Sequence, residues 1–254
     1  MQIEGAAGGG LVPWAVLAGL SEQGESGFSA GASLTDTGDY RLAVAGVQWS
    51  FDDRVELSLA RQSLELSALE SALGLDDARL DQTVFGAKVR FAGDLVYGTA
   101  PQVVLGAQWK RQHDFALPDA LGAEDDSGVD VYLGVARLIL DGPFHRNLLV
   151  TANLRATRAN ELGLLGFGSD RDDDYSFVAE GAAALFLNPR VAIGAEYRQK
   201  PDHLDAARES DWWDVFVGWF PSKRISVVAA YVDLGEVAGR DGQNGFYVSV
   251  NGNF

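Results

Sequence analysis

The stretch NGFYVSVNGNF, residues 244–254, ends the chain with a regular alternation of two kinds of side chain. One set is apolar and runs from Phe246 to Phe254, and the other is polar or amphipathic and includes Ser249 and Asn251. Successive side chains of a strand point to opposite faces, so the pattern predicts a strand with one apolar and one polar face. Soluble strands alternate too, and this strand alone leaves both a membrane and a soluble setting open.

The apolar face of this strand is completed by Phe254, the last residue of the sequence. In this respect it resembles the closing strand of bacterial outer-membrane β-barrels, in which the terminal aromatic also marks the protein for insertion. The resemblance implies recognition of the strand ending in Phe254 by the barrel-assembly machinery. It also implies contact with outer-membrane lipid and lipopolysaccharide.

Composition narrows the class of protein. The 254 residues suffice for one barrel, and the mean hydropathy of −0.02 fits strands that face lipid on one side and a polar interior on the other. The sequence contains no run of about 18 apolar residues, so no membrane-spanning helix is predicted.

The net charge of −16 argues against nucleic acid as a partner. No leader precedes Gln2, so we expect a signal peptide to have been removed and Met1 to be an added residue.

From residue 26 onward, alternating runs recur at the length of about ten residues that a tilted strand needs to cross a bilayer. An even strand number is usual in closed bacterial barrels, so we expect about twelve strands. The runs are 26–34, 40–50, 54–62, 82–92, 101–111, 128–140, 147–157, 175–187, 190–199, 211–220, 225–234 and 244–254.

The connections between these runs alternate in length. Tight turns such as Phe51–Arg54 and Leu187–Arg190 alternate with long polar connections at 63–81, 112–127, 158–174, 200–210 and 235–243. Short periplasmic turns and long external loops are typical of outer-membrane barrels.

Aromatic residues near both ends of the strands indicate two belts, one at each membrane–water interface. Toward the tight turns lie Trp49, Phe51, Phe91, Phe186 and Trp219, and toward the long loops lie Trp109, Tyr197, Trp213 and Tyr231.

These patterns predict an all-β protein with a single antiparallel transmembrane β-barrel over residues 26–254. Residues 1–25 form a separate N-terminal segment that is small and Gly-rich up to residue 10 and contains Pro13. Proline is poorly tolerated in a central strand. The segment is therefore either a first strand, which would change the strand number by two, or a plug that occupies the lumen.

The inward faces of the predicted strands carry charges of both signs, and buried charges need a partner or water. Either these residues pair across the lumen and close it, or they line a narrow pore. Near the long loops, Lys110, Arg155, Arg198 and Lys200 would form a basic mouth that acidic loop residues neutralise or leave free. The predicted lumen-lining residues are Glu56, Lys88, Arg90, Lys110, Asp130, Arg155, Glu180, Glu196, Arg198 and Asp214.

The external connection after Arg158 is unusual because glycines alternate with large apolar residues. It either folds into the barrel mouth as a constriction that contacts an apolar solute, or packs against neighbouring loops. A phosphate-binding loop is disfavoured, since no Lys-Ser/Thr pair follows the glycines. The candidate constriction consists of Gly163, Leu164, Leu165, Gly166, Phe167 and Gly168.

Several stretches resemble an outer-membrane family known only as a domain of unknown function. They are IEGAAGGGLVPWA (3–15), DDRVELSLARQ (52–62), RATRANELGLLGFG (155–168), EYRQKPDHL (196–204) and AYVDLG (230–235). The resemblance implies a β-barrel of the Gram-negative outer membrane with no assigned activity. The architecture is also similar, by analogy alone, to twelve-stranded channels linked to aromatic-compound catabolism.

We therefore expect a monomeric channel for passive diffusion of a small solute, with a hydrophobic or aromatic compound as the solute that the analogy suggests. A closed structural or surface-interaction barrel is the alternative. An outer-membrane hydrolase is less favoured, because neither a GxSxG nor an HExxH motif occurs and only His113 or His203, the latter with Asp205, offers a base on the external side. No catalytic residue, cofactor or metal site is predicted.

Overall fold

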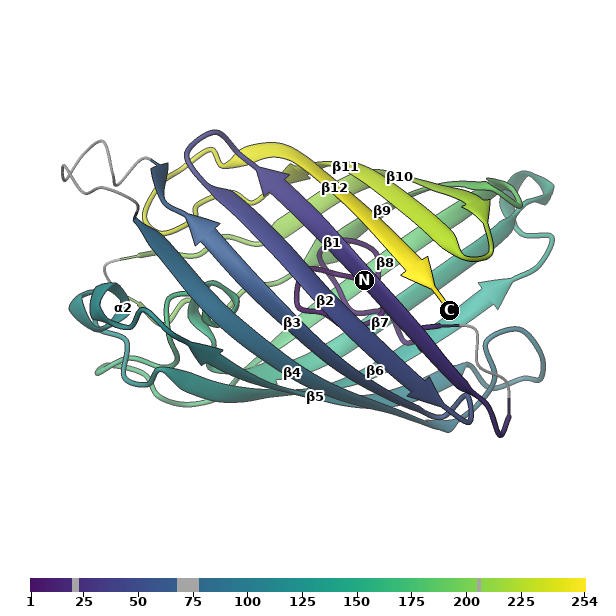
Figure 1. Cartoon of the computed structure of the whole chain (residues 1–254), viewed down its shortest axis with the longest axis horizontal. Coiled ribbons are helices and arrows are strands. Elements are labelled where there is room, and N and C mark those ends of the chain that lie inside the picture. Colours follow the sequence, from purple (N-terminus) through teal and green to yellow (C-terminus); the bar gives the residue numbers. More distant parts are fainter. Residues whose placement is uncertain (20–22, 68–77, 205–206) are drawn as a thin grey trace.

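The computed structural model describes residues 1–19, 23–67, 78–204 and 207–254, and these form a closed antiparallel barrel of twelve strands (Figure 1). Each strand pairs with its neighbours in the sequence, and β12 closes the barrel on β1. The strands are β1 (Ser26–Asp36), β2 (Arg41–Phe51), β3 (Val55–Glu65), β4 (Arg79–Ala92), β5 (Gln102–Gln112), β6 (Ser127–Ile139), β7 (Asn147–Thr157), β8 (Ser176–Asn188), β9 (Val191–Arg198), β10 (Trp212–Ser222), β11 (Ile225–Asp233) and β12 (Asn244–Asn253). The predicted fold class is confirmed.

The closing strand behaves as its sequence predicts. Phe246 and Phe254 are exposed on the outer face, whereas Tyr247 and Ser249 are buried on the inner face. Backbone bonds between Phe254 and Phe28 continue the seam to the end of the chain, with N···O distances of 3.1 and 2.8 Å. The terminal aromatic therefore lies on the outer surface beside the first strand.

The tight turns contain the residues that such turns require. Asp52 and Asp53 both have positive φ, of 56° and 47°, between β2 and β3. Two consecutive positive φ values characterise the type I′ hairpin turn, whose twist matches that of the flanking strands. The Arg54 N–H donates to the Phe51 carbonyl at 3.0 Å and closes the turn.

Several strand bounds differ from those expected. β3 continues to Glu65 and β4 begins at Arg79, so the predicted loop 63–81 is shorter at both ends than expected. Residues 68–77 of this loop lie outside the described part of the chain. In both extensions a buried leucine, Leu64 or Leu80, lies between polar residues that face outward, and this pattern continues each strand beyond the hydrocarbon. The external connection between β5 and β6 contains a short helix, α2 (Ala116–Ala120). The described residues also form two 3₁₀ turns, η1 (Pro143–His145) and η2 (Asn160–Gly163).

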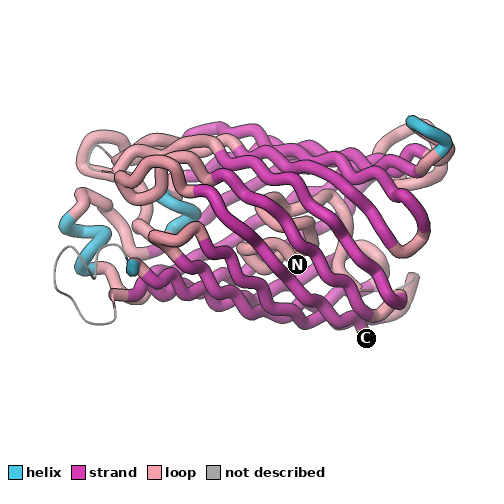
Figure 2. The backbone as a smooth tube through the Cα atoms, turned by 90° about the horizontal axis from the view of Figure 1, so that it is seen from above, coloured by secondary structure: helices cyan, strands magenta, loops and turns pink. Residues whose placement is uncertain are grey.

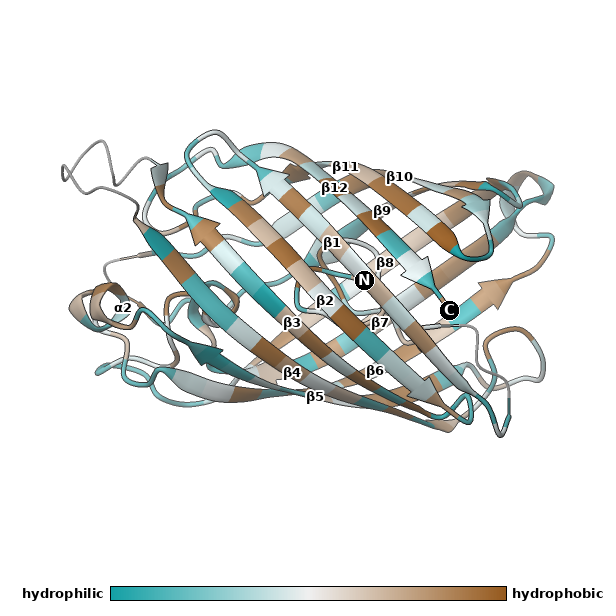
Figure 3. Cartoon of the chain, viewed as in Figure 1, coloured by the Kyte–Doolittle hydropathy of each residue, from teal (hydrophilic) through white to brown (hydrophobic). Residues whose placement is uncertain are grey.

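The outer surface of the barrel is apolar across its middle, where brown bands recur along the strands of Figure 3. Exposed side chains there include Leu59, Phe85, Leu105, Val217 and Val250. A soluble protein would bury such a surface, and a bilayer covers it. Within the described ranges, no helix is both long and apolar enough to cross a membrane.

The N-terminal segment lies inside the barrel, as two views at right angles show (Figures 1 and 2). Residues 11–19 belong to no strand, and an isolated bridge between Gly8 and Pro13 is the local pairing that the structure records. The described part of the N-terminal segment therefore takes the position of a plug and adds no strand to the barrel.

Candidate functional site

The plug, defined here as residues 1–18, folds back on itself in the lumen. The Ile3 N–H donates to the Gly10 carbonyl, and the Trp14 N–H donates to the Ala7 carbonyl, both at 2.9 Å. Small residues let this compact backbone approach the wall. A Cβ added to Gly9 would lie 2.1 Å from a Glu196 carboxylate oxygen, so a larger residue there would displace the Glu196 side chain.

Glu196 of β9 holds the middle of the plug. Its Oε2 accepts hydrogen bonds from the consecutive backbone N–H groups of Gly10, Leu11 and Val12 at 2.8, 2.6 and 3.4 Å. Its Oε1 accepts the indole N–H of Trp14 at 2.6 Å. Consecutive N–H groups that converge on one carboxylate form an anion-binding nest, here with the anion supplied by the barrel wall.

Glu56 of β3 and Lys88 of β4 hold both ends of the same segment. Glu56 accepts the N–H groups of Ala7 at 3.0 Å and Ala18 at 2.7 Å. The Lys88 ammonium donates to the Val16 carbonyl at 2.8 Å and pairs with Glu56 at 3.3 Å. The two charges thus neutralise each other and satisfy the plug backbone at the same time.

Four amide side chains on four different strands complete the attachment. Each donates one hydrogen bond to a plug carbonyl: Gln48 to Gly5 at 2.7 Å, Gln62 to Ile3 at 2.8 Å, Gln102 to Ala15 at 2.6 Å and Asn153 to Pro13 at 2.6 Å. The plug has no sheet to satisfy its backbone, and the wall side chains take the place of a neighbouring strand.

Glu4, the single charged side chain of the plug, enters a buried cluster of charges. It pairs with Lys110, with Arg198 at 2.7 Å and with Arg155 at 3.3 Å. Lys110 and Arg155 also reach Asp130, at 2.6 and 3.1 Å. Arg155 further pairs with Glu180 at 2.7 Å. Three cations thus face three carboxylates, and one of the carboxylates belongs to the plug.

The predicted lumen-lining residues divide into groups. Nine of the ten are buried in the interior. Eight of these nine belong to the Glu4 cluster, to the contacts of Glu56 and Lys88, or to those of Glu196. Arg90 lies apart toward the periplasmic end, half-buried, and pairs with Asp53 at 2.8 Å. Asp214 of β10 sits opposite Glu196 in the register but, among the described residues, forms no hydrogen bond to the plug.

The proposed basic mouth is not a free basic surface, because Lys110, Arg155 and Arg198 are buried in the Glu4 cluster. Lys200 lies between Glu161, at 2.8 Å, and Glu209. Burial raises the pKa of Glu209 to about 8, although Lys200 opposes the shift. Burial by itself would lower the pKa of Lys200, but the two carboxyls outweigh it and raise that pKa. Lys200 is therefore enclosed by two acidic side chains and is not free at the mouth.

The candidate constriction, residues 163–168, lies at the external mouth and contacts both the wall and a neighbouring loop. Phe167 is fully buried and exchanges backbone hydrogen bonds with Asp125 of the β5–β6 connection, at 3.0 and 3.1 Å. Just before it, the Leu162 carbonyl accepts a hydrogen bond from Gln82 of β4 at 3.1 Å. The loop therefore packs against its neighbour and covers the lumen.

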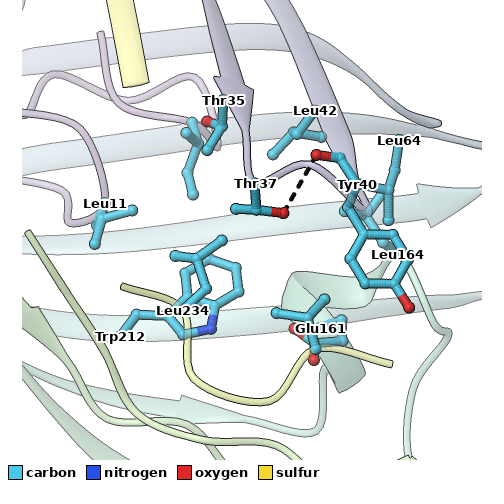
Figure 4. A pocket seen from close by; sticks show the side chains of 12 residues that line it. Leu11, Thr35, Thr37, Tyr40, Leu42, Leu64, Glu161, Leu164, Trp212 and Leu234 are labelled. Atoms are coloured by element: carbon cyan, nitrogen blue, oxygen red, sulfur yellow. Dashed lines mark hydrogen bonds between the residues drawn. The ribbon is translucent and has the colours of Figure 1, made fainter. Parts of the chain in front are cut away.

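A small apolar cavity of about 40 Å³ remains between the plug and these loops (Figure 4). Ile3 and Leu11 of the plug form one side of it, and loop residues such as Leu164 form another. Trp212 contributes an indole N–H that is buried without a hydrogen-bond partner among the described residues. The further lining residues are Thr35, Thr37, Tyr40, Leu42, Leu64, Glu161, Leu234 and Val237.

The histidines do not gather at one place. His113 is exposed and contacts the Thr83 hydroxyl at 2.9 Å, and His145 lies in the periplasmic turn, 3.1 Å from Asp141. His203 is buried beside Asp172 at 3.4 Å. Asp205, the partner considered from the sequence, lies outside the described residues.

Sequence reasoning missed Glu4 and the amide side chains. Glu4 is the single charge in an otherwise uncharged stretch from residue 2 to residue 20, and this isolation was the signal available. Gln48, Gln62 and Asn153 occupy inward positions of their strands, but an inward amide is ordinary in a polar lumen. Only the position of the plug identifies them as its partners.

Comparisons with known proteins agree with this architecture. A family model described as "Protein of unknown function (DUF3034)" matches residues 1–251. The KdgM porin is similar in structure, with a TM-score of 0.56 and 11% identity over 90% of this chain and 99% of that chain. The NanC porin gives a TM-score of 0.53 and 9% identity over 88% of this chain and 97% of that chain. No curated protein matches the sequence. The chain therefore belongs to the DUF3034 family, and its fold is the twelve-stranded outer-membrane β-barrel seen in these porins.

Proposed function

We propose that the protein is an outer-membrane channel for passive diffusion of a small apolar or aromatic solute, closed in this state by its N-terminal plug. One observation carries the proposal: the lumen is filled by a segment that lies outside the barrel strands and is held by polar bonds. Wall residues such as Glu196 and Gln102 direct their hydrogen-bonding groups to the plug backbone. Withdrawal of the plug would leave a lumen lined by polar groups that water can solvate.

The apolar cavity above the plug supports the class of solute. Its walls are mainly Leu, Ile and Val side chains, and the Trp212 N–H has no partner in the part of the chain that the structure describes. An aromatic ring needs a cavity on the order of 150 Å³, so the loops that carry Leu164 and Leu234 must move outward to admit one. A ring with one hydrogen-bond acceptor would suit this lining.

The channel is tested by planar-bilayer conductance of the intact chain and of a chain lacking residues 2–18. We expect few or no steps from the intact protein and discrete, larger steps from the shortened one, because the plug occupies the lumen. A compact band on an unheated gel checks that the shortened barrel has folded. Silence from a folded, shortened barrel would contradict the channel and leave a closed structural barrel.

The solute class is tested by fluorine NMR with 4-fluoroacetophenone, a small aromatic ketone. We expect saturable line broadening with the wild type and an affinity lowered about tenfold or more by Leu164→Trp, because overfilling a packed site costs about 1–3 kcal/mol. Leu133→Trp on the outer face is the matched control, since Leu133 is exposed and does not line the cavity. Equal broadening in all three proteins would mean partition into detergent and would contradict the site.

A further inference from the structure

The outward faces of β3, β4 and β5 change character before the strands end. On β3 the outward row passes from Leu59 to Arg61, and on β5 it passes from Trp109 to Arg111. On β4 the outward residue beyond Phe85 is Thr83. An apolar row that ends at an aromatic marks the edge of the hydrocarbon. The remaining external parts of these strands therefore lie at the level of the lipid headgroups.

Four exposed arginines occupy this external part on four adjacent strands: Arg41, Arg61, Arg79 and Arg111, called here the arginine patch. The register places them in two rows, since Arg61 and Arg111 both neighbour Thr83, and Arg41 and Arg79 both neighbour Glu65. The external ends of β8 to β12 carry outward aromatics instead: Phe177, Tyr197, Trp213, Tyr231 and Phe246. The rim of the barrel is thus divided into an arginine side and an aromatic side.

Carboxylates orient the arginine patch without burying it. Arg61 pairs with Asp81 at 3.0 Å, Arg79 with Glu65 at 3.7 Å and Arg111 with Asp126 at 3.7 Å. The arginine side chains are 46–54% exposed, and ion pairs this exposed are weak because water and salt screen them. A phosphate group can therefore compete for the guanidinium groups, whose planar donors suit its oxygens.

An apolar hollow lies directly beside the arginine patch on the lipid side. Ala30, Ala45, Val47 and Leu59 line it, and Arg61 and Thr83 also belong to its lining. The small side chains of β1 and β2 leave room there for one acyl chain against the wall. Charged donors beside an apolar groove match a lipid that carries phosphate at the hydrocarbon border.

We propose that this face binds lipopolysaccharide, with a lipid phosphate between Arg61 and Arg111 and an acyl chain in the hollow. Farther out, Arg41, which pairs with Asp36 at 2.8 Å, and Arg79 offer two more exposed guanidinium groups to further phosphates of the same molecule. Basic residues at the membrane surface attract anionic headgroups. The site fixes the rotation of the barrel relative to its annular lipid and does not depend on the channel proposal.

The experiment measures binding of fluorescent lipopolysaccharide, intact or dephosphorylated, to the purified full-length protein. Arg61→Gln/Arg111→Gln should weaken binding of the intact lipid about tenfold or more. Arg171→Gln/Arg208→Gln is the matched control, because both arginines are exposed in the external connections β7–β8 and β9–β10, on strands that do not carry the patch. Ala45→Trp, which fills the hollow, should weaken binding with the arginines unchanged.

Wild-type protein should bind the dephosphorylated lipid as weakly as Arg61→Gln/Arg111→Gln binds the intact lipid. Unchanged affinity in that double variant, with the compact band of a folded barrel on an unheated gel, would overturn the proposal. Equal wild-type affinity for the intact and dephosphorylated lipids would overturn it as well. A loss in the loop control equal to that in the patch variant would show that net charge alone drives binding and would also contradict the site.

Discussion

Replacing Glu196 with alanine is expected to raise the conductance of the full-length protein close to that of the chain lacking residues 2–18. Glu196 accepts hydrogen bonds from three backbone N–H groups of the plug and from the Trp14 indole. A hydrogen bond to a charged group contributes about 1.5–3 kcal/mol. Even if only two of these four bonds contribute fully, their loss shifts the equilibrium between docked and withdrawn plug by on the order of a hundredfold. Single-channel recording in a planar bilayer measures this shift as the open fraction.

Asp214→Asn is the matched control for that measurement. Asp214 is the buried carboxylate opposite Glu196 on the next strand, and it forms no hydrogen bond to the plug within the described residues. Its replacement changes a lumen carboxyl to an amide of the same size without removing a plug contact, so the open fraction should stay near that of the wild type. If Glu196→Ala were as silent as the wild type while the shortened chain conducts, the Glu196 contacts would not be what retains the plug.

Replacing Arg155 with methionine is expected to lower the free energy of unfolding by on the order of 3–5 kcal/mol. Arg155 is fully buried and pairs with Glu4, Asp130 and Glu180. It also lies over the Tyr132 ring, with 5.1 Å between its Cζ and the ring centroid. Without it, three carboxylates share Lys110 and Arg198, and uncompensated buried charge is costly. Urea titration in lipid vesicles, followed by tryptophan fluorescence, measures the change.

Two variants accompany this titration. Arg155→Lys keeps the charge but loses the forked geometry that reaches several carboxylates, so its effect should fall between those of the wild type and Arg155→Met. Arg90→Met removes a half-buried lumen arginine whose described ion pair is with the exposed Asp53, and it should cost less than about 1 kcal/mol. Equal losses for Arg90→Met and Arg155→Met would mean that the Glu4 cluster has no special part in stability.

The structure closes the lumen at two levels. The plug fills the middle of the barrel, and the loop around Phe167 covers the external mouth. Withdrawal of the plug alone leaves the loop in place, so the shortened chain reports on the plug separately. Any solute that reaches the apolar cavity from outside must first displace the loops that carry Leu164 and Leu234.

The twelve strands could be predicted because their pattern is local. A strand between lipid and a polar lumen must alternate at every residue, as Val215 and Val217 do with Asp214 and Phe216 on β10. The inward position of the charged residues could be predicted from the same period-two alternation. Strand ends were less certain where β3 and β4 extend beyond the membrane, because their exposed residues are charged and resemble a loop.

The sequence by itself determined the barrel, its direction in the membrane and the residues that face inward, since period-two alternation and turn length record those constraints along the chain. Only the tertiary structure decided the position of the plug and the pairing of the charges. Residues 2–18 have no periodicity, and the plug's partners are as distant as Glu196, 186 residues beyond Gly10. Glu4 meets Lys110, Arg155 and Arg198 only because the closed barrel brings three strands around one segment, and such convergence leaves no local pattern.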